Sequence, residues 1–252
     1  MTAPDPSALH TAEQDLAEAH RRTDALAIYA RRVSHDLSNF LTVIRTYAEL
    51  LIADTPPEHP SRADLEEIGR AADQTVTYLQ RASAFGRALQ ASAMPLLVDG
   101  LVSAVAAQLE ADGRGPLHCD ITSGARAQAA ASVLADAVQE LVKNAREAAG
   151  REATVTVRTR RITLETPRIE AAVPIPAGAW VVIEVRDPGP GVSASIAATV
   201  CDPFVTTKHG VRGAGLGLAL VRAVAWGADG QFTLGREADE TVARLYLPSA
   251  GG

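Results

Sequence analysis

Hydrophobic positions in the first part of the chain recur at alternating steps of four and three residues. The first such series is Leu26, Ala30, Val33, Leu37, Phe40, Ile44, Tyr47 and Leu51. This spacing is typical of a coiled-coil seam and predicts a helix over residues 11–53. A proline-rich turn, "DTPPEHPS" (54–61), separates it from a second, weaker series. The second series is Leu65, Ile68, Ala72, Thr75, Leu79, Ala82, Gly86 and Leu89.

Two antiparallel helices that carry one apolar stripe each form an unfinished core. A second copy of the hairpin would complete it, so we predict a four-helix bundle formed by dimerisation. In the alternative arrangement, both stripes pack on the remainder of the same chain. The 3.5-residue periodicity favours the dimer, because it suits helices that run nearly parallel.

Beyond "ASAMP" (91–95) the pattern changes to one of mixed helices and strands. Helices are expected over 97–110, in "AAASVLADAVQELVKNAREAAG" up to Gly150, and over 216–227. Strands are expected in "PLHCDI", "ATVTVRTRRITL", "AWVVIEVRD", "QFTLGR" and "TVARLYLP", with a loop in "ETPRIEAAVPIPAG". The fold class is therefore an α-helical hairpin followed by an α+β two-layer sandwich with a mainly antiparallel sheet. The predicted domains are an extension over 1–24, the hairpin over 25–94 and the sandwich over 95–252.

The first helix carries a histidine away from its apolar seam. His35 lies two residues after Val33 and two before Leu37, so at about 100° per residue it points away from the seam. Asp36 adjoins it and Asn39 lies one turn further along the same face. An acidic neighbour can polarise an imidazole and an amide can orient water, as the chemistry of a phosphoramidate requires. A polar surface with no further role is the alternative.

Two later blocks bring together carboxylates, an amide and glycines. "QELVKNAREAAG" places Glu140 and Asn144 one helical turn apart, and their oxygen atoms are of the kind that Mg²⁺ prefers. "RDPGPGV" places Asp187 at the end of a strand, followed by Gly189 and Gly191, which permit tight turns. A carboxylate at that point could accept a hydrogen bond from an exocyclic amine. A solvated helix face and an ordinary turn are the alternatives.

The block "DPFVTTKHGVRGAGLGLAL" indicates a phosphate site. Glycines lead directly into an apolar helix, and backbone amides at a helix N-terminus attract anions. Hydroxyl and ammonium donors for phosphate stand just before them. The residues concerned are Thr206, Thr207, Lys208, Gly213, Gly215 and Gly217.

Composition limits the partners and the cellular compartment that we expect for this chain. The chain has 24 basic and 30 acidic residues, a net charge of −6, which disfavours nucleic acid or an anionic membrane as the main partner. No apolar run is long enough for a membrane span. Cys119 and Cys201 are the only cysteines; we expect a reduced, cytoplasmic protein in which both are buried small hydrophobes. Trp226 is expected to pack in the core.

Taken in order, the blocks resemble the catalytic core of two-component sensor histidine kinases. "SHDLSNFLTVIRTYAEL" is similar to the H-box, "ELVKNAREA" to the N-box, "DPGPGV" to the G1 box, "DPFVTTK" to the F-box and "GAGLGLAL" to the G2 box. The resemblance implies a dimerisation and phosphotransfer hairpin and an ATP-binding domain of the fold shared with gyrase, Hsp90 and MutL. Pro188 replaces the usual asparagine after Asp187, and Glu147 stands where a basic residue is common.

The resemblance also implies roles for these residues. His35 would accept the phosphoryl group, Asp36 would assist as a base, and Asn39 would position water if the protein also dephosphorylates its regulator. Asn144, with Glu140 nearby, would bind Mg²⁺. Asp187 would bind the adenine amine of ATP in a pocket shaped by Gly189 and Gly191. Lys208 and the glycines of the G2 block would hold the phosphates.

The implied function is an ATP-dependent protein-histidine autokinase that passes the phosphoryl group to an aspartate of a response regulator receiver domain. The main alternative is an ATP-independent histidine phosphotransfer protein with a degenerate ATP-binding domain. A third reading is an ATPase or serine kinase of the same superfamily with Glu140 as base. Because no ordinary sensory domain is evident, we expect the signal to come from a separate sensory protein or through the N-terminal helix.

Overall fold

The computed structural model describes residues 32–206 and 215–250. They form two compact units that divide between Gly86 and Arg87. This division falls within helix α2 (Arg62–Gln90), before residue 94, at which the sequence pattern changes. Lys208, Thr207 and Gly213 lie outside the described residues.

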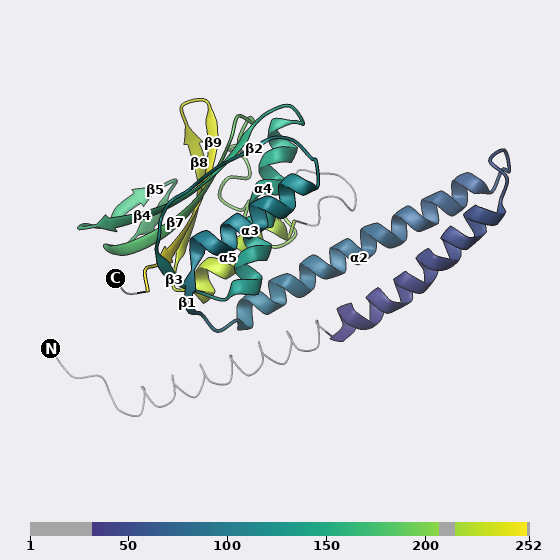
Figure 1. Ribbon diagram of the computed structural model, residues 1–252, viewed down its shortest axis with the longest axis horizontal. Helices are drawn as coiled ribbons and strands as arrows, with labels where there is room; N and C mark the ends of the chain where they lie inside the picture. Colours follow the sequence, from purple (N-terminus) through teal and green to yellow (C-terminus); the bar gives the residue numbers. More distant parts are fainter. Residues whose placement is uncertain (1–31, 207–214, 251–252) are drawn as a thin grey trace. The chain divides into compact units, whose positions relative to one another are not determined.

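The described part of the first unit contains two helices, one over residues 32–54 and the greater part of α2 (Figure 1). The guanidinium of Arg62 donates to the carbonyl oxygens of Ile52 (3.0 Å) and Thr55 (2.7 Å), which satisfies the end of the first helix. The helices approach closely at small residues, since a Cβ atom added to Gly69 would lie 3.9 Å from the Cβ atom of Ala48. The second predicted helix, the proline-rich turn and the part of the first predicted helix from residue 32 onward are confirmed, and residues 11–31 of the first predicted helix lie outside the described residues.

The apolar seam predicted for the first helix is exposed in the single chain. Leu37, Phe40, Ile44, Tyr47 and Leu51 are between 43% and 66% exposed. Ala48, which is not part of the predicted seam, is buried and faces Gly69 of α2. The seam therefore leaves apolar surface that this chain does not cover among its described residues.

The second unit contains a five-stranded sheet with the order β2-β4-β7-β9-β8. These strands are β2 (Leu117–Ile121), β4 (Val155–Leu164), β7 (Gly178–Asp187), β9 (Glu240–Pro248) and β8 (Gln231–Glu237). The β2–β4 pair is parallel and the other pairs are antiparallel, in agreement with a mainly antiparallel sheet. A short antiparallel pair that the sequence analysis did not predict is formed by β1 (Met94–Leu97) and β3 (Arg126–Ala129).

Three helices cover one face of this sheet: α3 (Val98–Ala111), α4 (Ala131–Ala149) and α5 (Gly217–Gly227) (Figure 1). Side chains alternate between the two faces of a strand, so Val181, Ile183 and Val185 of β7 point together toward the helices and are buried. Helix α4 ends as predicted at Gly150, whose φ of 87° is one that glycine adopts readily. The expected two-layer sandwich is thus present, with its core between helices and sheet.

The opposite face of the sheet carries a hairpin where a loop was predicted. Strands β5 (Arg168–Glu170) and β6 (Val173–Ile175) are joined by Ala171 and Ala172, with φ values of 47° and 65°. The hairpin contributes to a second, smaller core. This core contains Ile175, Trp180, Val182 and Tyr246, with Ile162, Leu164 and Val173 packed against it.

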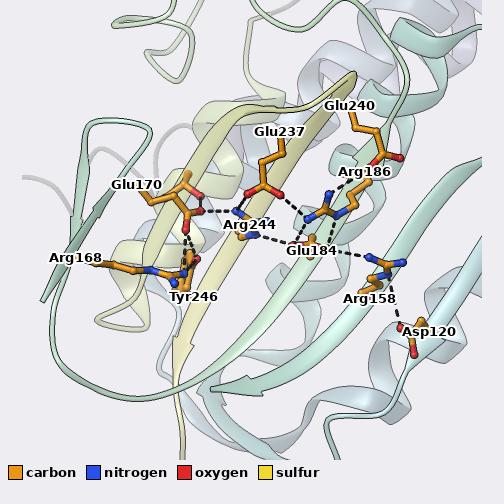
Figure 2. Close-up of polar contacts among 11 residues, drawn as sticks. Asp120, Arg158, Arg168, Glu170, Glu184, Arg186, Glu237, Glu240, Arg244 and Tyr246 are labelled. Carbon is orange, nitrogen blue, oxygen red and sulfur yellow. Dashed lines mark hydrogen bonds and ion pairs between the residues drawn. The ribbon is translucent and has the colours of Figure 1, made fainter. Parts of the chain in front are cut away.

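A network of ion pairs fills the rest of that face (Figure 2). The carboxylate of Glu184 is buried and accepts hydrogen bonds from Arg186 (2.6 Å) and Arg244 (2.6 Å). Glu170 of the hairpin accepts from Arg244 (3.0 Å) and from the Tyr246 hydroxyl (2.8 Å). Burial alone would raise the pKa of both carboxyl groups, but their hydrogen bonds and the neighbouring guanidinium charges lower it. The network therefore ties the hairpin to the central strands.

The sequence predicted that Trp226, Cys119 and Cys201 are buried, and these three predictions are wrong. Trp226 is 59% exposed, because α5 buries the adjacent positions Ala223 to Ala225 and leaves Trp226 on its outer side. Its ring stacks on Arg222, whose guanidinium carbon lies 4.8 Å from the ring centroid. Cys119 is exposed on the edge strand β2, and Cys201 is only partly buried.

Within the described ranges, no helix has the length and apolar character needed to cross a membrane.

Candidate functional site

The His35 imidazole projects from the first helix into solvent, as predicted. Its side chain is 73% exposed, and Asp36 Oδ1 lies 3.2 Å from its Nδ1 atom. Asn39, one turn later, places Nδ2 3.5 Å from the same Nδ1 atom. The structure thus brings together all three polar residues of this block.

Both contacts involve Nδ1, so they bear on which ring nitrogen carries the proton and which one keeps its lone pair. If Nδ1 carries the proton, it donates to the Asp36 carboxylate, and Nε2 keeps its lone pair. The Asn39 amide can donate to Nδ1 only in the other tautomer, and its distance is the longer of the two. The geometry therefore favours a ring whose Nε2 is nucleophilic and exposed, with a carboxylate placed to accept the Nδ1 proton.

In the second unit, Glu140 and Asn144 of α4 both lie against the start of α5. A Cβ atom added to Gly217 would lie 2.8 Å from Glu140 Oε2 and 3.4 Å from Asn144 Nδ2. The absence of a side chain at Gly217 therefore allows α5 to begin beside these two groups. Among the residues that the structure describes, no side chain caps the amino end of α5 at Leu216. Its first amides consequently remain suited to an anion.

The turn after β7 positions the Asp187 carboxylate. Asp187 is 5% exposed and its Oδ1 atom accepts a hydrogen bond from the Gly189 amide at 2.8 Å. A Cβ atom at Gly189 would lie 2.5 Å from that oxygen and 2.9 Å from the Cβ atom of Ala148, so no larger residue fits. Gly191 adopts a φ of 77°, in the left-handed region. The turn thus fixes one oxygen of Asp187 and leaves the other to a ligand.

Burial is the main influence on Asp187 and raises the pKa of its carboxyl group. The Gly189 amide and the charge of Arg236 act in the opposite direction, while Glu240 adds to the increase. A carboxylate in such surroundings gains from a ligand that donates a hydrogen bond to it.

Asp187 and Asn144 line one small cavity of about 100 Å³. Its walls come from α4, β7, α5, β8 and β9 and are mainly apolar. The lining residues are Leu141, Asn144, Ala145, Ala148, Val185, Asp187, Gly191, Val192, Leu218, Leu234, Thr241 and Ala243. A small, mainly apolar cavity that is lined by a carboxylate suits a flat heterocycle that carries an amine.

Glu140 faces a different and wider hollow of about 830 Å³ between α3 and α4. Lys143 and Glu147 also line it, and Lys143 Nζ lies 3.9 Å from Glu140 Oε1. Arg146 is mostly buried and donates to the carbonyl oxygens of Leu109 (3.0 Å) and Gly115 (2.8 Å). The Arg146 guanidinium is thus engaged by backbone oxygens, whereas the Lys143 ammonium lies near Glu140 at the hollow.

The backbone of Gly215, two residues before α5, lies close to the backbone of Phe204. The amide of Phe204 donates to the Gly215 carbonyl oxygen at 2.8 Å, and a side chain at Gly215 would overlap the Phe204 backbone. Gly215 has a φ of 63°. Thr206 is exposed beside this contact. The structure thus accounts for Gly215 and Gly217 of the predicted phosphate block.

Two residues of this site were missed by the sequence analysis. Arg236 of β8 and Thr241 of β9 both donate to the Gly189 carbonyl oxygen, at 2.8 Å and 3.2 Å. They lie in the closing hairpin, and nothing in its alternating pattern relates them to the Asp187 turn. The signal is the strand register, in which Asp187 pairs with Thr241, and that register is a tertiary property.

Glu140 and Asn144, the residues predicted to bind Mg²⁺, carry the oxygen donors that this ion prefers. No group of three or more His, Cys, Asp or Glu side chains that could hold a metal occurs among the residues of known placement. Mg²⁺ commonly binds through one or two protein oxygens together with phosphate and water. The Glu140 carboxylate and the Asn144 amide, side by side at Gly217, fit that requirement.

Residues 130–251 match the family described as histidine kinase-, DNA gyrase B- and HSP90-like ATPase. Over 254 aligned residues, the chain is 27% identical to the sensor kinase CckA of Brucella abortus, covering 96% of this chain and 26% of that protein. It is 28% identical to the sensory histidine kinase/phosphatase NtrB of Rhizobium meliloti, covering 88% of this chain and 58% of that protein. The chain thus spans from about a quarter to somewhat over half of these relatives.

Among solved structures, the fold is similar to that of full-length ShkA crystallised with AMPPNP. The TM-score is 0.64 at 20% identity, and the match covers 89% of this chain and 46% of ShkA. Acinetobacter baumannii histidine kinase AdeS matches with a TM-score of 0.51 at 13% identity, over 84% of this chain and 96% of that one.

Proposed function

The chain belongs to the sensor histidine kinases, and on that premise we propose that it is an ATP-dependent kinase that phosphorylates its own His35. The phosphoryl group would then pass to an aspartate of a response regulator receiver domain. The observation that carries the proposal is the exposed His35 ring, whose Nδ1 lies 3.2 Å from a carboxylate, in a chain that also has a mainly apolar cavity lined by Asp187.

The proposed nucleotide site assigns the adenine of ATP to the Asp187 cavity. The exocyclic amine would donate to the Asp187 oxygen that Gly189 does not occupy. The uncapped first amides of α5 would bind the phosphates. Thr206, Thr207, Lys208 and Gly213 are proposed to add donors. Asn144 and Glu140 would hold Mg²⁺, which neutralises charge on the β- and γ-phosphates.

In the proposed reaction, the His35 Nε2 lone pair forms a bond to the γ-phosphorus while the bond from that phosphorus to the oxygen of ADP breaks. Asp36 accepts the Nδ1 hydrogen bond and stabilises the positive charge that develops on the ring. In the second step the phosphorus–nitrogen bond breaks and an aspartate oxygen of the regulator takes the phosphoryl group. Asn39 would orient water for a separate dephosphorylating activity, in which a water oxygen forms a bond to phosphorus, the bond to the regulator's aspartate breaks and inorganic phosphate leaves.

We further propose that the protein acts as a homodimer. The exposed side chains of Leu37, Phe40, Ile44, Tyr47 and Leu51 form a stripe at coiled-coil spacing. Association of two hairpins into a four-helix bundle would bury this stripe. The stimulus would reach the dimer from a separate sensory protein or along its N-terminal helix.

Titration with MgATP separates this proposal from a phosphotransfer protein that does not use ATP. We expect saturable binding by the wild type and at least about tenfold weaker binding by Asn144→Ala, because the metal ligand is lost. Absence of binding, with phosphotransfer to and from His35 retained, would favour the alternative. Acid-stable phosphate on the protein after incubation with ATP would favour a serine kinase, since a phosphoramidate is acid-labile.

A further inference from the structure

Both backbone polar groups of Gly189, its amide and its carbonyl oxygen, form hydrogen bonds with side chains. Its amide donates to Asp187 Oδ1 at 2.8 Å, and its carbonyl oxygen accepts from Arg236 Nη1 at 2.8 Å and from Thr241 Oγ1 at 3.2 Å. The neighbouring residues Pro188 and Pro190 have no amide hydrogen with which to fix the turn. The turn that presents Asp187 therefore depends on side chains from the closing hairpin.

Arg236 is anchored along its length against this turn. A Cβ atom at Gly191 would lie 3.2 Å from both Cγ and Cδ of Arg236, so the aliphatic stem packs on the Gly191 backbone. Its Nη2 atom donates to the Asp239 carbonyl oxygen at 3.1 Å. One guanidinium thus joins the β8–β9 turn to the turn after β7.

The charge of Arg236 also acts on the Asp187 carboxylate. Among the described charged groups, Arg236 on β8 favours the ionised form, and Glu240 on β9 disfavours it. The cavity wall formed by α4 presents the uncharged residues Asn144, Ala145 and Ala148. Arg236 therefore supports the form of Asp187 that can accept a hydrogen bond from an amine.

We propose that Arg236 is a positioning residue for nucleotide recognition, which holds the Gly189 carbonyl so that the Asp187 carboxylate faces the cavity. It acts through the turn and does not touch the nucleotide. This inference rests on the proposed function, because it takes the adenine of ATP as the ligand of the cavity. The residue lies outside all the sequence blocks that carry the resemblance to histidine kinases.

The test compares Arg236→Met, which keeps the stem, with Arg236→Lys, which keeps the charge and one donor. Arg160→Met serves as the control, since Arg160 is exposed on β4 and has no polar partner among the described residues. The first measurement is the pKa of the Asp187 carboxyl group in the nucleotide-free protein, from the pH dependence of its ¹³Cγ NMR signal. The second is the Kd for MgATP at several pH values, by calorimetry.

We expect Arg236→Met to raise the Asp187 pKa and to weaken MgATP binding about tenfold at neutral pH. The acid limb of binding should move to higher pH in that variant. Arg236→Lys should restore both quantities, with a Kd within about threefold of the wild type. Arg160→Met should match the wild type.

An unchanged Asp187 pKa or an unchanged Kd in Arg236→Met would overturn the inference. A loss of affinity that Lys does not restore, with the acid limb unmoved, would show a purely structural role and would overturn it as well. A different result would show that the proposed function itself is wrong: the wild type binds no MgATP, although the Asp187 pKa still differs between the wild type and Arg236→Met. The role of Arg236 in nucleotide recognition would then be wrong as well.

Discussion

Gly217 at the start of α5 lies directly against Glu140 of α4, so that a Cβ atom at position 217 would be 2.8 Å from Glu140 Oε2. The glycine thus allows the amino end of one helix to meet the carboxylate and amide of another. Glu140 and Gly217 lie 77 positions apart in the sequence, so their two blocks meet only in the folded chain.

We predict that Gly217→Ala leaves the fold intact but reduces autophosphorylation at least about tenfold. The added methyl group would push the flexible Glu140 carboxylate aside and disturb the metal ligands. The measurement is the rate of phosphohistidine formation, with thermal unfolding as a check on the fold. Gly100→Ala is the matched control, because a Cβ atom there meets nothing within 4 Å. Equal rates in both variants would contradict the assigned metal site.

The exposed seam of the first helix predicts a dimer that one charge can disrupt. Phe40 is 66% exposed in the single chain, and burial of an aspartate at this position would oppose association. Sedimentation velocity should show a dimer for the wild type and a monomer for Phe40→Asp. Thr46→Asp adds the same charge at an exposed position away from the seam and should remain dimeric. A monomeric wild type would refute the four-helix bundle.

Loss of Arg244 should destabilise the second unit. Its guanidinium donates to Glu184 and Glu170, and removing it would take a charged partner from the buried Glu184 and from the partly buried Glu170. We expect Arg244→Met to lower the free energy of unfolding by about 2–4 kcal/mol in urea denaturation. Arg160→Met, on the same face of the sheet, should change it by less than about 0.5 kcal/mol. Comparable effects in the two variants would show that the network adds nothing specific.

The same network predicts loss of stability in acid. Hydrogen bonds from Arg244, followed by those from Arg186, lower the pKa of Glu237 from 4.5 to about 2. A carboxyl group with a lowered pKa stabilises the fold above its unfolded value and loses that contribution as pH falls through its folded value. The melting temperature should therefore fall between about pH 4.5 and pH 2, and it should fall less steeply in Glu237→Gln. Glu58→Gln, in the turn of the first unit, should follow the wild type; identical profiles in all three proteins would exclude this role for Glu237.

The sequence predicted the elements with strong local signals, and it failed where long-range packing decides. Helix α4 and its end at Gly150 follow from apolar periodicity and one glycine. The β5–β6 hairpin could not be recognised, because Ala171 and Ala172 occupy the turn positions that glycine or asparagine usually marks. Tyr246 and Glu170 stabilise that hairpin from positions far apart in the chain, which no local pattern reports.

The candidate site shows the same division. His35, Asp36 and Asn39 are neighbours on one helix, so spacing alone brings them together. Arg236 reaches the Asp187 turn only because β8 and β9 fold back beside β7, and that register is set by the whole sheet.

The most direct test of the account is incubation of the purified protein with γ-labelled ATP and Mg²⁺, followed by acid treatment. We predict acid-labile label on the wild type and on His118→Gln, a histidine of the edge strand β2, and none on His35→Gln. Label that persists undiminished in His35→Gln would contradict the central claim that this imidazole receives the phosphoryl group.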